Sequence, residues 1–533
     1  MRTGSANDGA CLQGGGSLMS MLHTECLSPS RAHATAIAVA DIGLTISYGA
    51  LATAARRLAG EIACHLPAGG GRAAVLLPSS IEFCVVAFAL LERGIAVAPI
   101  DVSLRGLSLD TALRRLSPHV VVAAPSVMAR VPRDRLAECS LKLNLECVHT
   151  ERSPALVVEL ASDLGSDRRM IAVQQDDGMA EPGEGATRNP GADALLVSTS
   201  GSTGLPKYVR LGHAGTLFNA RGHLKALGLT APFRAFQALD VSYSYGLVAS
   251  MLATFVAGGT LCLPVRSDLQ ALRPALIRSG ATVCLGSPAL FDYMLQTCPA
   301  DERDGLRALT VIGIGGDRAT ETLRRRIAAA LPQVAAHVTY GVTEAGPRVA
   351  TLPPDRLLTA PDSVGFPLDG VEIAILGEDG EPMPAGEVGL LHIRTPSRMN
   401  GYLDDPTPLD PSGWLAVKDL ASLDPEGMLV IHGRADRQFK HRGRRINPAQ
   451  IERVIERLPK VVSVRVEPVP GSDSLRAIVH HQIDVGDDFC DRLVAHCRRN
   501  LPPRLVPEIV ETIPETGGFF FKGRPLAVPG TVG

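Results

Sequence analysis

The chain has 533 residues, of which 45% are hydrophobic and 20% charged, a composition typical of a globular protein with roughly two to four domains. Lysine and arginine (53) nearly balance aspartate and glutamate (55), so the charge gives no indication of a nucleic-acid partner or of binding to an anionic membrane. No apolar run reaches the roughly 18 residues of a membrane span, and eleven cysteines without a C-x-x-C pair favour reduced thiols in a cytoplasmic protein.

The first third of the chain alternates expected strands and helices. Residues 1–20 are rich in glycine and serine, and we expect them to be disordered. Continuous apolar runs then predict strands, and helical spacing of apolar residues predicts helices between them. The expected strands are 44–48, 72–77, 96–100 and 119–124, and the expected helices are 49–65, 81–94 and 107–116. Such alternation favours an α/β domain with a parallel sheet.

The middle of the chain continues this pattern after a polar loop at 176–193. The expected strands are 194–197, 260–263, 281–285, 309–314 and 336–340, and the expected helices are 214–227, 269–279 and 320–331. Loops rich in glycine or hydroxyl side chains follow some of these strands, at 198–207, 315–317 and 341–344. Ligands of an open α/β sheet bind at the carboxyl ends of its strands, so these loops are the candidate site.

The pattern changes from about residue 364. Short expected strands at 372–376, 389–393 and 428–432 lie between turns and predict a small antiparallel β subdomain. The last stretch predicts a small α+β domain, with helices at 448–458 and 488–501 and strands at 461–466 and 476–480. We therefore expect a large N-terminal domain over 21–435 and a small mobile C-terminal domain over 436–533, with a hinge near Asp436.

The stretch Ser198-Thr-Ser-Gly-Ser-Thr-Gly-Leu-Pro-Lys207 has the chemistry of a phosphate-binding loop. Gly201 and Gly204 allow successive N–H groups to turn toward one anion, and the hydroxyls and Lys207 add donors and positive charge. The spacing G-x-x-G-x-x-K is not that of a Walker loop. A polar surface turn is the alternative for this stretch taken alone.

Several motifs in order resemble the adenylate-forming superfamily, which includes acyl-CoA synthetases, peptide-synthetase adenylation domains and firefly luciferase. The resemblance covers nearly the whole chain from about residue 40. The motifs that carry it are the loop 198–207, Tyr340-Gly-Val-Thr-Glu-Ala-Gly346, Gly386-Glu387 with Gly389 and Gly401-Tyr402, Trp414 with Asp419-Leu420, and the run from Gly433 to Ile446 (GRADRQFKHRGRRI).

The resemblance implies a site for ATP and Mg²⁺. Lys207 would hold the leaving pyrophosphate, Tyr340 would stack on adenine, Thr343 would bind the α-phosphate, Glu344 would ligate Mg²⁺, and Asp419 would accept from the ribose hydroxyls. Arg434 would reach the ribose or the α-phosphate. The other implied nucleotide-binding residues are Thr199, Ser200, Gly201, Ser202, Thr203, Gly204, Gly316, Asp317 and Gly341. The alternatives are a helix-start acid for Glu344 and a loop-capping acid for Asp419.

Two lysines near the C-terminus are implied to serve different steps. Lys440, with Gly443 near a thiol tunnel, would act in thioester formation after a rotation at Asp436; a solvated charge in a basic run is the alternative for Lys440. Lys522 would stabilise the charge that develops during adenylation. Its motif departs from the family's P-x-T-x-x-G-K, because the lysine comes two residues later. Val417-Lys418 also replaces the family's Thr-Gly before Asp419.

The acid's pocket is expected around Tyr243, Ser244 and Gly246, with Gly313, Gly315 and Gly341 completing it. Amino-acid-activating relatives carry an aspartate where this chain has Tyr243. A buried ammonium without a partner is costly, so the substrate is expected to be a small carboxylic acid without an α-amino group.

The sequence therefore predicts a two-step ligase. ATP and a carboxylic acid would give acyl-AMP and pyrophosphate, and a thiol would then give a thioester and AMP. The thiol belongs either to coenzyme A or to the phosphopantetheine of a separate carrier protein. An amino-acid-activating stand-alone adenylation domain and a catalytically weak nucleotide-binding scaffold remain as alternatives.

Overall fold

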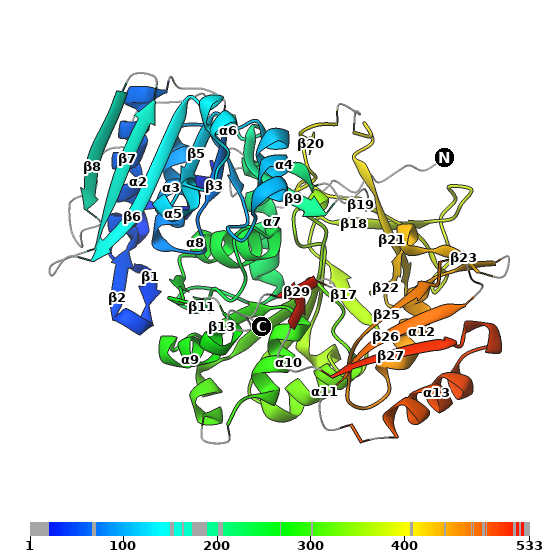
Figure 1. Ribbon diagram of the computed structural model, residues 1–533. Helices are drawn as coiled ribbons and strands as arrows, with labels where there is room; N and C mark the ends of the chain where they lie inside the picture. The colour runs from blue at the N-terminus through cyan, green and yellow to red at the C-terminus, as the bar shows by residue number, and fades with distance from the viewer. Residues whose placement is uncertain are drawn as a thin grey trace, which may run out of the picture.

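The computed structural model describes residues 21–66, 71–149, 154–162, 165–172, 189–200, 206–266, 268–299, 302–405, 409–441, 444–470, 472, 474–481, 485–486, 488–514, 519–521 and 524–526. A large sheet-rich N-terminal part and a smaller C-terminal part make up this α/β molecule, as predicted (Figure 1). The N-terminal stretch expected to be disordered lies outside the described residues.

The larger sheet joins a parallel half to an antiparallel half. In spatial order its strands are β18 (Glu372–Leu376), β19 (Gly389–Arg394), β21 (Trp414–Leu423), β22 (Leu429–Arg434), β17 (Ser363–Pro367), β16 (Ala350–Leu352), β15 (Ala335–Tyr340), β14 (Val311–Gly315), β13 (Val283–Gly286), β11 (Arg234–Phe236), β12 (Thr260–Cys262), β1 (Thr35–Val39) and β2 (Leu44–Ser47). The strands from β15 to β12 run parallel, and those from β18 to β16 pair antiparallel. The expected antiparallel subdomain is thus continuous with the parallel sheet.

The second sheet forms the other side of the N-terminal part. Its order is β20 (Gly401–Tyr402), β10 (Pro206–Gly212), β9 (Asp193–Ser200), β4 (Ala96–Pro99), β3 (Arg72–Leu76), β5 (Val120–Ala123), β6 (Leu141–His149), β7 (Pro154–Ser162) and β8 (Gly165–Ala172). The meander β6–β8 was not predicted, and it extends the sheet at the far left of Figure 1.

Helices cover both sheets. They are α1 (Leu22–Cys26), α2 (Tyr48–His65), α3 (Ile81–Glu92), α4 (Gly106–Leu116), α5 (Pro125–Met128), α6 (Arg133–Ala137), α7 (His213–Ala226), α8 (Ala253–Ala257), α9 (Leu269–Ser279), α10 (Pro288–Gln296) and α11 (Glu321–Ala330). Side-chain oxygens cap several of their first turns, because the first backbone N–H groups of a helix have no partner within it; the capping residues are Ser47, Ser80, Asp268, Ser287 and Thr320. No helix in the described ranges has the length and apolar character that crossing a membrane requires.

A π-helix, Tyr245–Leu252, precedes α8 and was not predicted. Gly246 lies in its first turn, where a Cβ atom would come within 2.3 Å of the Asp240 carbonyl oxygen. The Gln237 side chain binds the carbonyl of Gly246 at 3.0 Å and accepts from the Ser250 hydroxyl at 2.8 Å. Wide helical turns of this kind occur often at functional sites.

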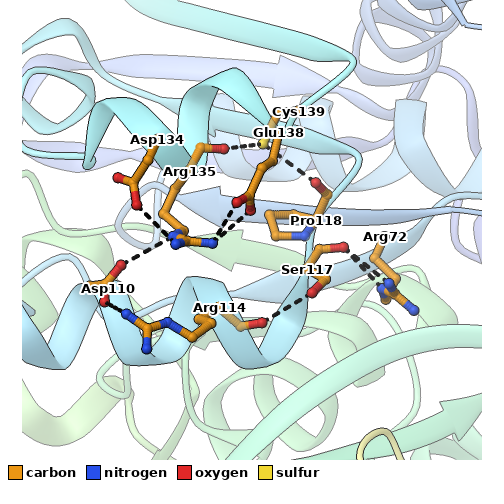
Figure 2. Close-up of polar contacts among 9 residues, drawn as sticks. All are labelled: Arg72, Asp110, Arg114, Ser117, Pro118, Asp134, Arg135, Glu138 and Cys139. Carbon is orange, nitrogen blue, oxygen red and sulfur yellow. Dashed lines mark hydrogen bonds and ion pairs between the residues drawn. The ribbon is translucent and has the colours of Figure 1, made fainter.

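Ion pairs fasten α6 to α4 at the surface of the second sheet (Figure 2). The Arg135 guanidinium lies between Asp110 of α4 and two acids of its own segment, Asp134 and Glu138, with the nearest N–O distance 2.7 Å. Asp110 also pairs with Arg114. Ion pairs at a protein surface contribute little to stability, so we expect this cluster to orient the two helices.

The C-terminal part has a core of its own. It contains β23 (Phe439–His441), β24 (Arg444–Ile446), α12 (Pro448–Glu456), β25 (Val461–Pro468), β26 (Leu475–His481), α13 (Phe489–Asn500), β27 (Ile509–Pro514), β28 (Phe519–Phe521) and β29 (Arg524–Leu526). Apolar side chains of α12, α13 and the sheet β25–β26–β27 form a separate buried cluster. β28 contacts α10 of the N-terminal part, and its partner β29 is labelled near the centre of Figure 1.

Candidate active site

The predicted phosphate loop connects two antiparallel strands. β9 extends to Ser200 and β10 begins at Pro206, and Lys207 pairs in register with Thr199. The Thr199 hydroxyl donates to the carbonyl of Lys207 at 3.5 Å. Gly201, Ser202, Thr203 and Gly204 lie outside the described residues. The two ends of the motif are therefore held by a hairpin, whereas the sequence predicted a strand followed by a loop.

Lys207 and Glu344 are linked through Tyr402, which lies on the short strand β20. The Tyr402 hydroxyl donates to Glu344 Oε1 at 2.9 Å, and the Lys207 ammonium lies 4.8 Å from the centre of the Tyr402 ring. Lys207 Nζ also lies 3.9 Å from a carboxylate oxygen of Asp405. Antiparallel pairing of β20 with β10 places Tyr402 beside Val209. The sequence motif Gly401-Tyr402 was noted, but Tyr402 was not predicted as a site residue.

The loop after β15 turns back sharply. Gly341 has no room for a side chain, because a Cβ atom there would lie 2.0 Å from the Pro347 carbonyl oxygen. The short helix Thr343–Ala345 follows, and the Thr343 hydroxyl lies 2.9 Å from the Ser244 hydroxyl. This contact brings the predicted α-phosphate residue to the predicted acid pocket.

Tyr340, Asp419 and Arg434 meet at the junction of the two halves of the larger sheet. The Tyr340 hydroxyl donates to Asp419 Oδ2, and Arg434 Nη1 lies 3.6 Å from Asp419 Oδ1. Asp419 and Arg434 are directly paired positions of β21 and β22. Burial raises the pKa of Asp419 above its usual value, although the hydrogen bond from Tyr340 and the charge of Arg434 oppose this. Three residues that the motifs assigned to the nucleotide therefore contact one another.

Arg434 binds Asp436 with both ends of its guanidinium, at 2.9 and 3.0 Å. Lys418 Nζ lies 3.6 Å from the same carboxylate. The side chain of Arg434 lowers the pKa of Asp436 below its usual value. Lys418, which replaces the family's glycine, thus contacts the predicted hinge residue Asp436. The sequence did not predict this contact.

Other side chains lie close to two of the glycines in the predicted acid pocket. A Cβ atom at Gly313 would lie 2.6 Å from Leu285 Cδ2, and one at Gly315 would lie 2.4 Å from Thr339 Oγ1. Tyr243 is exposed and Gly246 is buried in the π-helix. The structure adds two residues that no motif singled out: Tyr245, whose hydroxyl donates to the Gly313 carbonyl at 2.9 Å, and the buried Arg348. The available signal was an arginine two residues after the motif that ends at Gly346.

The structure also describes three further predicted site residues, Gly316, Asp317 and Lys440. Gly316 has a positive φ of 86° at the end of β14, and the Asp317 carboxylate accepts from the Arg318 N–H at 2.7 Å. Lys440 is exposed on β23. Gly443 and Lys522 lie outside the described residues.

The described residues include no cluster of three or more side chains that could hold a metal by themselves. The single carboxylate of Glu344 would suit Mg²⁺, because this ion commonly uses one or two carboxylates together with substrate phosphates and water. The residues therefore suit a metal that arrives with a nucleotide.

Comparison with known proteins gives the family. The sequence pattern of the AMP-binding enzyme family matches residues 28–403, more than half of the chain. Feruloyl-CoA synthase of an Amycolatopsis species is 28% identical over 507 residues, covering 92% of this chain and 95% of its own. Sulfoacetate–CoA ligase of Cupriavidus necator is 27% identical over 481 residues, covering 89% and 90%.

A solved structure shares the fold. The anthranilate CoA ligase AuaEII in complex with anthranoyl-AMP superposes with a TM-score of 0.79 at 18% identity, covering 93% of this chain and 94% of its own. The resemblance read from the motifs is confirmed by these comparisons. The chain belongs to the AMP-binding enzyme family.

Proposed function

We propose that this protein is an AMP-forming ligase that joins a carboxylic acid to a thiol. In the first step a carboxylate oxygen attacks the α-phosphorus of ATP, the bond to the β-phosphate oxygen breaks, and pyrophosphate leaves. In the second step a thiol sulfur attacks the acyl carbon, the bond to the AMP oxygen breaks, and the thiol proton is released. The relatives named as CoA ligases support this reaction class.

The observation that supports the proposal is the convergence, from distant segments, of side chains that we expect to bind the nucleotide. Tyr340, Asp419 and Arg434 form one contact chain, and Lys207 and Glu344 meet at Tyr402. An ionised carboxylate suits two ribose hydroxyls, and a lysine beside a carboxylate that can hold Mg²⁺ suits a pyrophosphate leaving group. When bound, Mg²⁺ would neutralise phosphate charge, with Glu344 as its ligand.

We infer further details by resemblance. Thr343 would bind the α-phosphate, and Lys522 would stabilise its developing charge. Asp436 would be the hinge between domains 21–435 and 436–533, and Lys440 with Gly443 would serve the thiol step. The acceptor is coenzyme A or a carrier-protein phosphopantetheine, and the setting is the cytoplasm.

Pyrophosphate exchange with a panel of carboxylic acids tests the first step. Acid-dependent incorporation of labelled pyrophosphate into ATP is expected, and loading assays with coenzyme A or purified carrier proteins then identify the acceptor. Exchange only with α-amino acids would identify an amino-acid-activating domain. Nucleotide binding with no exchange for any acid would favour the scaffold and overturn the ligase.

A further inference from the structure

Two arginines of the N-terminal part are almost completely buried, but their surroundings differ. Arg324 is 2% exposed, and its guanidinium donates to three backbone carbonyls. Arg348 is 3% exposed; its Nη1 donates to the Thr339 hydroxyl at 2.6 Å, and its Nε has no hydrogen-bond partner among the described residues. A buried donor without an acceptor is costly, and more so when it is charged. Arg348 therefore holds unused donor capacity.

The charge of Arg348 is not matched by a carboxylate within the described part of the chain. The guanidinium lies instead over the ring of Tyr245, with Cζ 3.9 Å from the ring centre. Burial lowers the pKa of Arg348 to about 10, so the side chain remains protonated at neutral pH. An aromatic face stabilises a desolvated cation, but this only partly offsets the cost of burying the charge.

Two buried histidines near Arg348 also have unused nitrogens. Neither ring nitrogen of His223, on α7, has a hydrogen-bond partner among the described residues, and the same holds for Nδ1 of His337, on β15. Burial, then the charge of Arg348 and the proximity of His337, lower the pKa of His223 well below its usual value, and burial lowers that of His337 to about 4. Both rings are neutral at neutral pH, and a neutral imidazole has one N–H. His337 uses its N–H in a hydrogen bond to the backbone of Leu352, whereas His223 keeps its N–H to donate.

This polar cluster adjoins the glycines expected to line the acid's pocket. A Cβ atom at Gly315 would lie 2.9 Å from Arg348 Nη1, and one at Gly313 would lie 3.3 Å from the Tyr245 hydroxyl. His337 and Thr339 alternate along β15 and so share one face of the sheet. Residue 244, next to Tyr245, reaches Thr343 through the hydroxyl contact described above. The unused donors therefore lie on the acid's side of the site.

We propose that Arg348, with His223, binds a second anionic group on the acid, so that the substrates are carboxylic acids carrying a distal carboxylate or sulfonate. This inference rests on the proposed ligase function and names its substrate class. The guanidinium supplies the positive charge and a planar pair of donors, a geometry suited to carboxylate and sulfonate oxygens. The same charge would repel the ammonium of an amino acid placed beside it.

Matched acids in the pyrophosphate exchange assay test this inference. The pairs are succinate and butanoate, glutarate and pentanoate, isophthalate and 3-methylbenzoate, each with the half-amide of the diacid as a neutral isostere. We expect kcat/KM for at least one diacid to exceed that for its neutral isosteres by at least about 10²-fold, because a site built for polar contacts rejects analogues that lack them. Arg348→Met is expected to remove this preference, and Arg348→Lys to keep part of it.

Controls separate a change of specificity from a loss of folding. Arg307→Met replaces an exposed arginine that pairs with Asp304, and it is expected to leave the ratio unchanged. Circular dichroism and thermal melting report whether each variant folds. The ratio of kcat/KM for a diacid to that for its neutral isosteres is measured in the unmodified protein. It therefore tests the inference even if Arg348→Met is unfolded.

The outcomes for the inference and for the function are distinct. Equal or better exchange with the neutral acids would overturn the inference and leave the ligase function intact. A preference for diacids that persists in folded Arg348→Met would also overturn it, because another group would then bind the anion. Exchange with no acid, despite ATP binding, would overturn the ligase function and the inference with it.

Discussion

Asp419 is a buried carboxylate whose two oxygens face different partners. Oδ2 accepts from Tyr340, and Oδ1 lies 3.6 Å from Arg434, on the neighbouring strand. A charged acceptor of two ribose hydroxyls cannot be replaced by an amide, because one amide position donates. Asp419→Asn is therefore expected to raise the KM for ATP in pyrophosphate exchange by about 10- to 100-fold, the value of hydrogen bonds to a charged group.

The matched control for this substitution is Asp410→Asn. Asp410 is an exposed acid that closes a turn with Ser412, and its loss of charge is expected to leave the KM for ATP unchanged. An unchanged KM for ATP in folded Asp419→Asn would show that this carboxylate does not bind the ribose.

At the scale of elements, the π-helix depends on a close backbone approach at Gly246. An alanine Cβ would lie 2.3 Å from the Asp240 carbonyl oxygen and 2.8 Å from that of Leu239, so the helix must move. Gly246→Ala is expected to cost about 1–3 kcal/mol or more, to lower the Tm and to raise the KM for the acid. Gly60→Ala is the control: nothing lies within 4 Å of that position inside α2, and the alanine is expected to stabilise by about 0.5–1 kcal/mol. Equal melting temperatures for the two variants would contradict the packing argument.

The contact between α12 and the loop before α11 depends on a buried acid. Glu456 pairs with Arg318 at 2.6 Å beside a cavity of about 270 Å³, and burial raises its pKa to about 7, although Arg318 opposes the shift. A raised folded-state pKa gives stability that is present below the unfolded value of 4.5 and is lost as the pH rises through about 7.

Glu456→Gln is therefore expected to remove this pH dependence. Between about pH 5 and pH 8 the Tm of the unmodified protein should fall relative to that of the variant. The free energy of unfolding should fall by up to roughly 3 kcal/mol. Scanning calorimetry across this range measures the difference. Glu321→Gln, which removes an exposed partner of Arg325 at the same cavity, should leave the slope unchanged. Parallel pH profiles for Glu456→Gln and the unmodified protein would show that Glu456 ionises normally.

At the scale of the whole molecule, the sequence predicted most of the strands and helices of the parallel half, although it missed β11 and α10. These predictions succeeded because apolar periodicity is local and the motifs recur in order. Strand pairing is not local, so the β9–β10 hairpin around the phosphate loop and the meander β6–β8 were not predicted.

Contacts between side chains that are far apart in the sequence could not be predicted from the sequence either. The contact between Tyr402 and Glu344 joins the two sheets. Tyr402 lies on β20 at the edge of the second sheet, and Glu344 lies on the short helix that follows β15 of the larger sheet. Arg348 is buried over Tyr245 because the loop from Gly341 folds back on itself. Neither fact follows from residue order, since each depends on how two elements pack.

The small C-terminal part contacts the large one at more than one place. Asn447 donates to the carbonyl of His432 at 2.9 Å, Arg318 binds Glu456, and β28 lies against α10. Lys440 is on the exposed strand β23, and Lys522 follows β28 in the chain. The two lysines therefore belong to different segments of the C-terminal part, and substitutions should separate the two half-reactions.

We expect Lys522→Ala to slow pyrophosphate exchange by about 10²- to 10³-fold, the cost of losing one stabilising donor, while transfer from supplied acyl-adenylate to the thiol continues. Lys440→Ala should do the reverse, because it would act only after the small domain has turned at Asp436. Lys225→Ala, an exposed lysine paired with Asp369, should change neither rate. Equal losses in both half-reactions for Lys522→Ala would mean that this lysine supports binding common to the two steps, and exchange that persists in that variant would assign the adenylation charge to another group.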